Sequence, residues 1–312
     1  MGTPGFACGP LETLARSEHS LLAVVTVPDK PSGRGCRLSP CEVKLKALDL
    51  NLPIFQPEKL RDETFLGEMA ALEADVFVVV AFRILPQVLY SVPRLGAINI
   101  HGSLLPKYRG AAPIQRALLN GETETGLTSF FLTRQVDTGD VIDRVSTPIG
   151  PDENFTSLSD RLSQLAGPFL LRTLDLITRP DFAPMRQDPS LATPAPKITP
   201  EDCLINWGAD DSQVHNQIRA FSEKPGAYGF FDDMILKILG SSRGQFNELP
   251  PLEPGEMYVQ GRKLFIGTGG RPLEITRLQP EGKKAMDAKA FLNGYRVQSH
   301  QKLQTNRKEV RE

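Results

Sequence analysis

The chain has 312 residues, of which 40% are hydrophobic and 23% are charged, so it can form roughly two domains of about 150 residues, each with its own core. Its 36 Lys and Arg residues nearly balance its 37 Asp and Glu residues. This balance excludes a disordered polyelectrolyte or a uniformly basic coat for nucleic acid, so an anionic partner must be bound locally. The longest apolar stretches, residues 21–27 and 76–82, fall far short of the roughly 18 residues that a membrane-spanning helix needs.

The N-terminus and the cysteines indicate the compartment. No Lys or Arg precedes Arg16, so the charged front and apolar middle of a secretory signal are absent and we expect a cytoplasmic protein. The four cysteines, Cys8, Cys36, Cys41 and Cys203, include no C-x-x-C pair. Scattered cysteines in a chain of this length are typical of reduced thiols, so we expect neither disulfides nor a metal site.

Residues 1–180 alternate amphipathic stretches with short apolar runs that are bounded by turn residues. The apolar runs predict strands over residues 21–27, 53–56, 74–81, 97–101, 125–132 and 141–147. The amphipathic stretches predict helices over residues 11–17, 42–48, 62–72 and 158–177. This alternation is typical of a parallel sheet with crossover helices, so we predict an α/β, Rossmann-like N-terminal domain.

Proline marks the end of this domain. Six prolines between residues 179 and 200 remove amide donors and forbid a helix, so residues 181–200 are predicted to form an extended linker. Beyond it, short β-rich runs separated by Gly and Pro turns follow a helical stretch, which predicts a small β-barrel over residues 201–300. We expect residues 301–312 to form a frayed polar tail.

Basic residues gather in two places on this neutral chain. Residues 30–46 hold five Lys and Arg residues and one acid, and residues 277–311 hold nine Lys and Arg residues and three acids. Patches of this size are ordinary on solvated surfaces, and they are also surfaces that can bind a polyanion. The charges alone leave both interpretations open.

Residues able to do chemistry are densest between Asn99 and Asp140. The segments are Asn-Ile-His-Gly-Ser-Leu-Leu-Pro at 99–106, Arg-Gly-Ala-Ala-Pro at 109–113 and Asp-Thr-Gly-Asp at 137–140. Reactive groups of open α/β sheets lie at the carboxyl ends of strands, and Asn99 and His101 end a predicted strand. Because the two residues are two apart on that strand, their side chains point to the same face. We therefore expect an amide and an imidazole in one pocket.

An amide beside an imidazole suits acyl transfer to an amine. The Asn99 amide can donate to the oxyanion of a tetrahedral intermediate, and His101 can move a proton at neutral pH. Asp137, in a turn between two predicted strands, can return to this face and orient the imidazole. No G-x-S-x-G elbow occurs, so direct attack by the acceptor amine is favoured over a covalent acyl-enzyme.

Each of these features has a simpler interpretation when it is taken alone. A His at a strand end is often structural, because imidazole readily hydrogen-bonds the backbone. Asp-Thr-Gly is usually a turn. It is also the aspartic-protease triplet, but that chemistry needs two such carboxylates and the chain has no second triplet. The combination therefore carries more information than any one of its parts.

The three segments together resemble the active-site signature of the 10-formyltetrahydrofolate-dependent formyltransferases, including the 36 residues that separate His101 from Asp137. Four further stretches are similar to the branch of this family that formylates methionyl initiator tRNA: residues 2–7, residues 28–35, residues 195–197 with 205–207, and residues 279–286. The resemblance runs over residues 1–296 and so covers both predicted domains.

The resemblance implies roles for individual residues. Asn99, His101 and Asp137 match the family's catalytic amide, imidazole and carboxylate. The stretch that binds tetrahydrofolate in the family is matched here by Ser103, Leu104, Leu105 and Pro106. The segment whose backbone receives the pterin ring in the family is matched by Phe82, Arg83, Ile84 and Leu85. The implied co-substrate is 10-formyltetrahydrofolate, with no metal.

The resemblance also implies how tRNA is bound. The loop at residues 30–37 matches a family loop that wedges into the acceptor stem, and the C-terminal domain matches an OB-like β-barrel that holds the tRNA flank. Contacts with tRNA are therefore expected at Lys30, Arg34, Arg37, Lys283 and Lys284, since phosphate neutralisation by Lys and Arg supplies much of the sequence-independent affinity.

One feature of the N-terminus departs from the family pattern. Family members begin with a short hydrophobic strand before Gly-Thr-Pro, whereas here Met1 stands directly before Gly2. We therefore expect the central first strand to be missing from the domain over residues 1–180. Nothing in the sequence requires an oligomer, so we expect a monomer.

Two alternatives to tRNA formylation stay open from the sequence. One is formyl transfer to another amine, either glycinamide ribonucleotide or an amino sugar; the long C-terminal domain and the lack of a Gly-rich phosphate loop argue against the first of these. The other is a non-catalytic RNA-binding relative, against which the intact trio of amide, imidazole and carboxylate argues.

Overall fold

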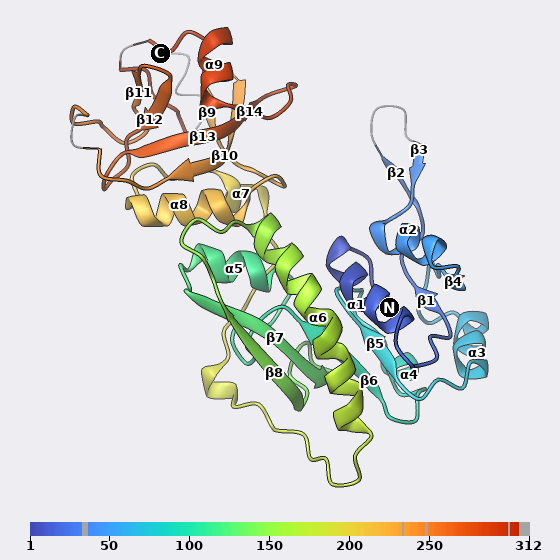
Figure 1. Cartoon of the computed structure of the whole chain (residues 1–312). Helices are drawn as coiled ribbons and strands as arrows, with labels where there is room; N and C mark the ends of the chain where they lie inside the picture. Colours follow the sequence, from blue (N-terminus) through green and yellow to red (C-terminus); the bar gives the residue numbers. More distant parts are fainter. Residues whose placement is uncertain (33–36, 233, 247–248, 299, 306–312) are drawn as a thin grey trace. The chain divides into compact units, whose positions relative to one another are not determined.

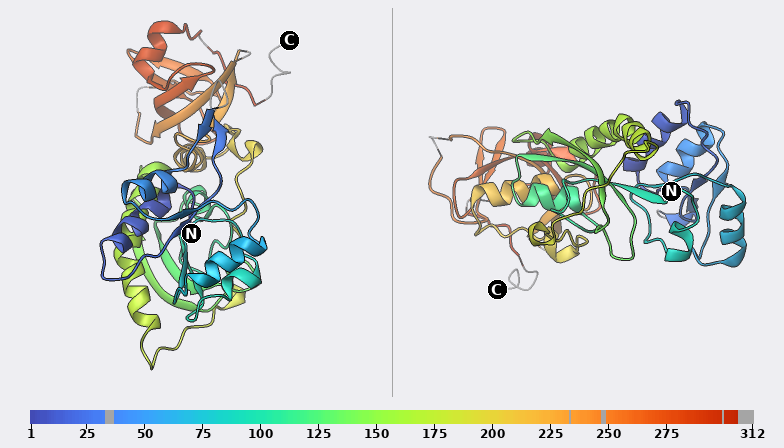
Figure 2. Two further views of the ribbon diagram at one scale, coloured as in Figure 1. Left: turned by 90° about the vertical axis from the view of Figure 1, so that its right-hand side faces the viewer. Right: turned by 90° about the horizontal axis from the view of Figure 1, so that it is seen from below.

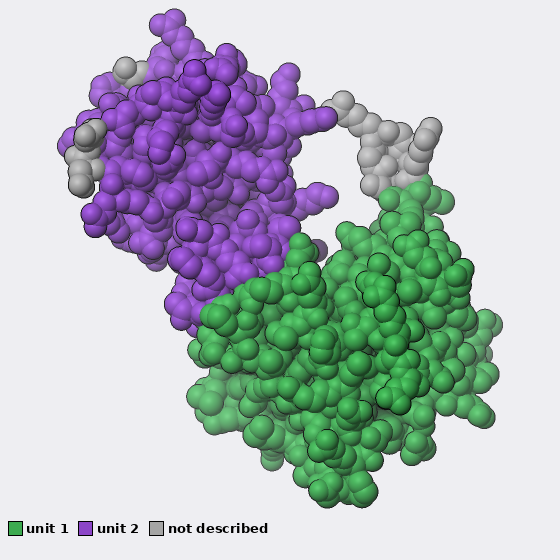
Figure 3. Space-filling model, in the orientation of Figure 1, with its two compact units in different colours: residues 1–113, 124–148, 159–196 green, residues 114–123, 149–158, 197–312 purple. Residues whose placement is uncertain are grey.

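The computed structural model describes residues 1–32, 37–232, 234–246, 249–298 and 300–305. The chain folds into two compact units, which Figure 3 colours separately. Unit 1 comprises Met1–Pro113, Glu124–Pro148 and Ser159–Pro196, and unit 2 comprises Ile114–Thr123, Ile149–Leu158 and Lys197–Glu312. In the described part of the chain, no helix is both long enough and apolar enough to span a membrane.

Unit 1 contains a mixed sheet, which corrects the prediction of a parallel one. Strands β5 (Phe77–Val79) and β6 (Ala97–His101) are parallel, whereas β7 (Glu124–Phe131) and β8 (Val141–Pro148) continue the sheet as antiparallel neighbours in the order β5-β6-β7-β8. The connection between β7 and β8 is too short for the crossover of about a dozen residues that a parallel pair requires. The remaining described strands of unit 1 are β1 (Val24–Val25), parallel to β4 (Ile54–Phe55), and the hairpin of β2 (Lys30–Ser32) and β3 (Arg37–Ser39).

Helices cover the sheet of unit 1. They are η1 (Gly5–Ala7), α1 (Cys8–Ala15), α2 (Glu42–Asp49), α3 (Glu63–Ala71), α4 (Gln87–Tyr90), η2 (Pro189–Leu191) and α6 (Phe155–Ile177), whose first residues belong to unit 2. Helix α6 runs along β7 and β8 in all the views of Figures 1 and 2, and Thr173 on this helix donates a 3.0 Å hydrogen bond to Ser129 on β7. Asp62 starts α3 by accepting a hydrogen bond from the Phe65 amide, as an N-cap residue does.

The first two residues lie between β1 and β5. The Met1 nitrogen donates to the Val78 carbonyl at 2.6 Å, the Gly2 amide donates to the Val25 carbonyl at 3.1 Å, and the Val80 amide donates to the Met1 carbonyl at 2.9 Å. A Cβ on Gly2 would lie 2.9 Å from the Val80 carbonyl oxygen, so a larger residue does not fit. An apolar cavity of about 670 Å³ adjoins them, with walls from α1, β1, β5 and α6. In place of the strand expected to be missing, the described chain thus has one isolated parallel bridge, Gly2 to Val80, together with the hydrogen bonds to Val25 and Val78.

Unit 2 is mostly antiparallel β, as the sequence predicts for the second domain. Its strands pair in the order β11-β12-β13-β10-β9, and β14 pairs with β13. They are β9 (Ala227–Phe231), β10 (Met234–Ser242), β11 (Met257–Gln260), β12 (Lys263–Ile266), β13 (Leu273–Pro280) and β14 (Met286–Asp287). The helices are α5 (Pro113–Leu119), which starts at the last residue of a unit 1 segment, α7 (Pro200–Cys203), α8 (Asp211–Ala220) and α9 (Ala288–Gly294). Helix α8 packs on β10 (Figure 1).

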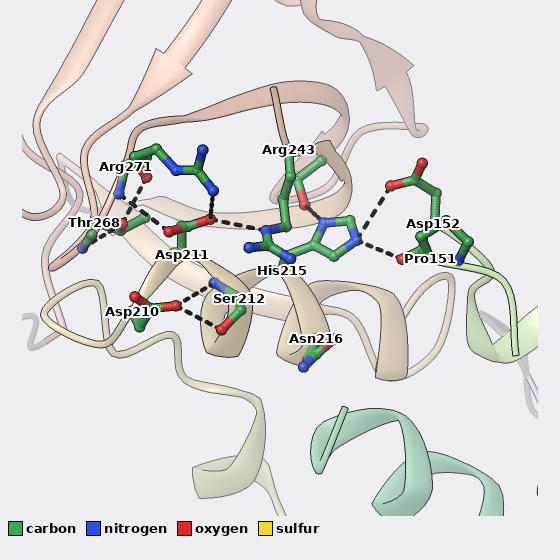
Figure 4. Close-up of polar contacts among 12 residues, drawn as sticks. Pro151, Asp152, Asp210, Asp211, Ser212, His215, Asn216, Arg243, Thr268 and Arg271 are labelled. Carbon is green, nitrogen blue, oxygen red and sulfur yellow. Dashed lines mark hydrogen bonds and ion pairs between the residues drawn. The ribbon is translucent and has the colours of Figure 1, made fainter. Parts of the chain in front are cut away.

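A buried carboxylate and a buried imidazole connect α8 to the rest of unit 2 (Figure 4). The Asp211 carboxylate is 5% exposed and accepts hydrogen bonds from the guanidinium of Arg243 at 2.9 Å and from the backbone amide of Arg271 at 3.3 Å. His215 is equally buried, with Nδ1 2.9 Å from the Ser241 hydroxyl, and burial lowers the pKa of its imidazole. Because the buried carboxylate and imidazole are hydrogen-bonded within the cluster, they stabilise the packing of α8.

The Pro-rich segment belongs to unit 1 up to Pro196 and to unit 2 from Lys197, which differs from the separate linker predicted over residues 181–200. Met185 exchanges two backbone hydrogen bonds with Val141, the Arg109 amide donates to the Thr193 carbonyl, and the Ala195 amide donates to the Arg109 carbonyl. The segment is also not wholly extended, because it contains the 3₁₀ helix η2 and because a short α-helix, Pro200–Cys203, begins at its last residue. The amides of the other residues remain free to pair with unit 1.

The chain end also differs from the predicted tail over residues 301–312. Lys302 forms an antiparallel bridge with Glu256, and Gln304 forms one with Phe230. Residues 301–304 therefore extend the sheet region of unit 2, whereas residues 306–312 lie outside the described residues.

Two helical glycines of unit 1 provide a matched test of its packing. A Cβ on Gly9 of α1 would lie 2.2 Å from the Ser163 carbonyl oxygen of α6, whereas a Cβ on Gly67 of α3 would have open space around it. We expect Gly9→Ala to lower the free energy of unfolding by about 1–3 kcal/mol, the usual cost of overpacking. Gly67→Ala should raise it by up to ~1 kcal/mol, because alanine is the better helix former. Urea denaturation measures both changes, and a Gly9→Ala protein as stable as its parent would contradict the close crossing of α1 and α6.

Candidate active site

Strand β6 delivers an amide and an imidazole to one face of the sheet in unit 1. Ile98 and Ile100 are at most 2% exposed and belong to the core, so the alternation of the strand turns Asn99 and His101 to the opposite face. Asn99 is the one residue of β6 that is only partly buried. Asn99 lies near the carboxyl end of β6 and is partly exposed to solvent, so its side chain is available to a ligand.

His101 and Asp137 meet as a buried pair. His101 Nδ1 lies 3.8 Å from Asp137 Oδ2, and the two side chains are 7% and 9% exposed. His101 Nε2 lies 2.8 Å from the Tyr108 carbonyl oxygen. Because a carbonyl oxygen only accepts hydrogen bonds, Nε2 carries the proton in the neutral ring and Nδ1 is the basic nitrogen. The basic nitrogen thus faces the carboxylate, and the structure brings these two predicted residues together from the end of β6 and from the connection between β7 and β8.

The carboxylate of Asp137 is held by a second loop. Its Oδ2 accepts a 2.8 Å hydrogen bond from the Gly110 amide. Asp137 itself has a left-handed backbone, with φ 54°, a conformation that costs a non-glycine residue about 1 kcal/mol or more and therefore needs support from its surroundings. Gly110 has φ 130°, and a Cβ there would lie 2.5 Å from the Ala195 carbonyl oxygen, so glycine is required at this close approach.

The turn after β6 is held by internal hydrogen bonds. The Ser103 hydroxyl is fully buried and donates to the Lys107 carbonyl at 2.7 Å. The Thr128 hydroxyl on β7 donates to the Ser103 carbonyl at 2.7 Å and accepts from the Leu105 amide at 3.0 Å. Ser103 and Leu105 are therefore buried supports of the turn, whereas Leu104 and Pro106 are partly exposed.

The second predicted folate segment, residues 82–85, borders a pocket. The pocket has a volume of about 590 Å³, and its lining includes Arg83, Ile84 and Leu85 together with Arg61 and Arg134. The Arg83 guanidinium donates to two backbone carbonyls, those of residues 57 and 58, and burial lowers its pKa. With three arginines and no acid among the described residues that line it, the pocket suits a ligand that carries negative charge. Phe82 is partly buried against the core of unit 1, and Arg83 lies over its ring.

The residues predicted to contact tRNA lie on both units. Lys30 is exposed on β2, which pairs with β3. Arg37 begins β3, and Arg34 lies outside the described residues. Lys283 and Lys284 are exposed in the turn between β13 and β14 of unit 2.

Two supporting residues of the site belong to none of the motifs in the sequence. Thr128 lies within a predicted strand, where a buried threonine is unremarkable, and Gln187 lies within the predicted linker. The Gln187 side chain is 5% exposed and donates to the Asp137 and Gly139 carbonyls. Thr128 lies opposite His101 in the β6–β7 pair. A correct prediction of the register of these two strands would therefore have pointed to it. Gln187 has no local signal.

Two family models match this chain. The formyl transferase family matches residues 2–174, and the C-terminal domain of formyl transferases matches residues 197–296. The second match lies within unit 2, and the first covers most of unit 1 together with the segments 114–123 and 149–158 of unit 2. The fold and the site therefore define a formyltransferase with both of the domains that these models describe.

Full-length relatives narrow the assignment. The methionyl-tRNA formyltransferase of Geobacter sulfurreducens is 44% identical over 306 residues, which cover 97% of this chain and 95% of the relative. The methionyl-tRNA formyltransferase of Citrifermentans bemidjiense is 43% identical over 302 residues, which cover 96% and 93%. The chain belongs to the methionyl-tRNA formyltransferase family.

Solved structures share the fold at lower identity. WlaRD, a sugar 3N-formyl transferase crystallised in the presence of dTDP and 5-N-formyl-THF, matches with a TM-score of 0.66 at 19% identity and covers 91% of this chain and 97% of WlaRD. HypX from Aquifex aeolicus in complex with tetrahydrofolic acid matches with a TM-score of 0.60 at 20% identity, covering 79% of this chain and 43% of HypX. Folates therefore occur in structures that share this fold.

The turn after β6 can be tested through Thr128. Thr128→Val removes the hydroxyl from a fully buried site and leaves a buried carbonyl and a buried amide unpaired, so we expect the free energy of unfolding to fall by about 2 kcal/mol or more. Thr26→Val is the matched control, since Thr26 is equally buried but its hydroxyl lies 3.0 Å from a thiol, that of Cys41; this change should cost less than about 1 kcal/mol. Denaturant titration measures both, and equal losses would mean that Thr128 has no special role in the turn.

Proposed function

We propose that the protein transfers the formyl group of 10-formyltetrahydrofolate to the α-amino group of methionyl initiator tRNA and so supports translation initiation. The observation that carries the proposal is the buried His101–Asp137 pair, 3.8 Å apart, on the face of β6 to which Asn99 also points. This arrangement occurs in a chain that aligns over nearly its whole length with methionyl-tRNA formyltransferases.

The three side chains have separate tasks in the proposed reaction. The α-amino nitrogen attacks the formyl carbon, and the Asn99 amide donates to the oxygen that becomes negative in the tetrahedral intermediate. His101 accepts the amine proton at Nδ1 and returns it to N10 of the folate as the bond between the formyl carbon and N10 breaks. Asp137 stabilises the imidazolium, because a carboxylate within about 4–6 Å favours the charged ring. The products are formylmethionyl-tRNA and tetrahydrofolate.

The folate is proposed to bind between the two segments that resemble its site in the family. Ser103, Leu104, Leu105 and Pro106 form one wall, and the backbone of Phe82, Arg83, Ile84 and Leu85 receives the pterin ring. The 590 Å³ pocket beside residues 83–85 supports this placement, since a cavity adjoins the backbone that is proposed to receive the ring.

The tRNA is proposed to bind through both units. The loop that contains Lys30, Arg34 and Arg37 enters the acceptor stem, and unit 2 acts as an OB-like barrel that holds the flank of the tRNA through Lys283 and Lys284. Exposed lysines suit this task, because phosphate neutralisation needs charge but no fixed geometry. The proposed enzyme is a cytoplasmic monomer.

An acceptor competition tests the proposed activity. The protein is incubated with 10-formyltetrahydrofolate and, in turn, methionyl initiator tRNA, glycinamide ribonucleotide and an amino sugar nucleotide, and formyl transfer to each is measured. We expect transfer to the tRNA alone. Faster transfer to either small amine would overturn the assignment of substrate, and tRNA binding without transfer would identify a non-catalytic RNA-binding protein.

Substitution of the catalytic groups tests the mechanism. His101→Ala and Asn99→Ala should each lower kcat by roughly 10²-fold or more, the usual effect of losing a proton-transfer group or an oxyanion donor. His19→Ala, which removes an exposed imidazole of unit 1, should keep the rate of the parent. Single-turnover formylation gives these rates, and activity of either active-site variant within tenfold of the parent would reject the assigned roles.

The salt dependence of tRNA binding tests the basic turn of unit 2. Replacing both Lys283 and Lys284 with alanine should weaken methionyl-tRNA binding and reduce the slope of log K against log salt by about 2, one for each lost phosphate contact. Arg16→Ala combined with Lys59→Ala removes two exposed cations of unit 1 and should leave the slope unchanged. Filter binding at several salt concentrations measures the slopes. The same slope for both double variants would show that the turn with Lys283 and Lys284 does not contact the tRNA.

A further inference from the structure

Gln187 connects the proposed catalytic loop to the loop after β6. Its side chain is buried in unit 1, and its Nε2 donates to the Asp137 carbonyl at 3.0 Å and to the Gly139 carbonyl at 2.8 Å. Its Oε1 accepts two hydrogen bonds from the guanidinium of Arg109, from Nε at 3.1 Å and from a terminal nitrogen at 2.8 Å. Both Nε2 donors and both acceptor positions of Oε1 are therefore used within the site.

The orientation of the Gln187 amide is dictated by its partners. Carbonyl oxygens only accept hydrogen bonds and a guanidinium only donates them, so Nε2 must face the loop of Asp137 and Oε1 must face Arg109. Arg109 is itself fixed, because its backbone amide and carbonyl pair with Thr193 and Ala195 of the same extended segment that carries Gln187. The amide thus has one arrangement that satisfies every group.

The loop that Gln187 holds needs this support. Asp137 has a left-handed backbone, and the Gly139 position has no room for a side chain, since a Cβ there would lie 1.7 Å from the Phe131 carbonyl oxygen. A tight turn of this kind keeps its shape only while the surrounding structure determines it. Without the two donors from Gln187, two buried carbonyls lose their partners and the turn can relax toward other conformations.

We propose that Gln187 is a positioning residue for formyl transfer, which sets the Asp137 carboxylate against His101 without touching the substrates. This inference rests on the proposed function, because it assigns Gln187 an effect on that same reaction. The carboxylate is placed by two contacts at once: Gly110 binds its Oδ2, and Gln187 holds the main chain of the residue that bears it. Loss of the second contact shifts the carboxylate, and a displacement of about 1 Å at a reacting group can cost 10²-fold in rate.

Steady-state kinetics of Gln187→Met provides the first test. Methionine keeps the volume of the side chain but removes both Nε2 donors, so we expect kcat for methionyl-tRNA formylation to fall by roughly ten- to a hundredfold, with the KM values for tRNA and folate changed by less than about threefold because no substrate contact is lost. The matched control is Gln217→Met in unit 2, where Nε2 also donates to two backbone carbonyls, those of Asp202 and Leu204. This control should lose stability but keep kcat.

Glutamate at the same position separates positioning from folding. Gln187→Glu keeps an oxygen for Arg109 and thus a buried, charge-paired side chain, but it replaces the donor to the Asp137 loop with a second acceptor. We expect a folded protein, by circular dichroism and thermal melting, with kcat lowered at least as much as in Gln187→Met. A folded Gln187→Glu protein with the kcat of the parent would overturn the proposal even if Gln187→Met failed to fold.

A double-mutant cycle with Asp137→Asn is the decisive test. If Gln187 acts through the carboxylate, Gln187→Met should lower single-turnover rates by less than about threefold in the Asp137→Asn background, because the group that it positions has already been lost. A merely structural role predicts the same fold-loss in both backgrounds, and that result would contradict the proposal. An inactive parent would instead refute the proposed function, so the two failures can be told apart.

Discussion

The hydrogen bond from the Gly110 amide to the Asp137 carboxylate links the two loops on which the candidate site depends. One loop follows β6 and the other connects β7 to β8, and both carry backbone groups that are shielded from water. Shielded backbone groups must be paired within the protein. Here the partners are side chains, with Thr128 serving the first loop and Gln187 the second. The same contacts that satisfy the loops therefore bring the imidazole of His101 and the carboxylate together.

This construction explains why the site can be both buried and charged. A carboxylate that is removed from water needs hydrogen bonds, and Asp137 accepts one from the Gly110 backbone amide. The neighbouring imidazole of His101 supplies an opposite charge once it has taken up a proton in the proposed reaction. The imidazole has one nitrogen committed to the Tyr108 carbonyl and one nitrogen facing the carboxylate. The imidazole and the carboxylate are thus in position for the proposed proton transfer before the substrate binds. Neither group has to move to stabilise the charge that develops in the reaction. The exposed lysines of unit 2 are proposed to serve affinity for tRNA, a task that tolerates mobile side chains.

The part of this site that is local in the chain could be predicted from the sequence. Strand alternation is enough to place Asn99 and His101 on one face, and the structure has them so. The approach of Asp137 was expected from the chemistry and from a family resemblance, because no periodicity relates residues 36 positions apart. Gln187 could not be found in this way, since its partners are carbonyl groups and every residue has one. The prolines around it predict an extended linker, but they do not reveal that this segment pairs with Arg109 and Val141 of unit 1 or that it contains a 3₁₀ helix. Similarly, apolar runs predicted β7 and β8 but not their antiparallel direction, which follows from the short connection between them.

The most direct measurement of the central claim is a crystal structure of the protein with 5-formyltetrahydrofolate, an isomer that does not present the formyl group on N10. The account predicts that the folate lies against residues 103–106 with N10, the atom that carries the formyl group in the co-substrate, toward Asn99 and His101, within direct hydrogen-bond reach of about 3 Å or the reach of one bridging water. Folate bound at another surface, with N10 far from the His101–Asp137 pair, would contradict the account.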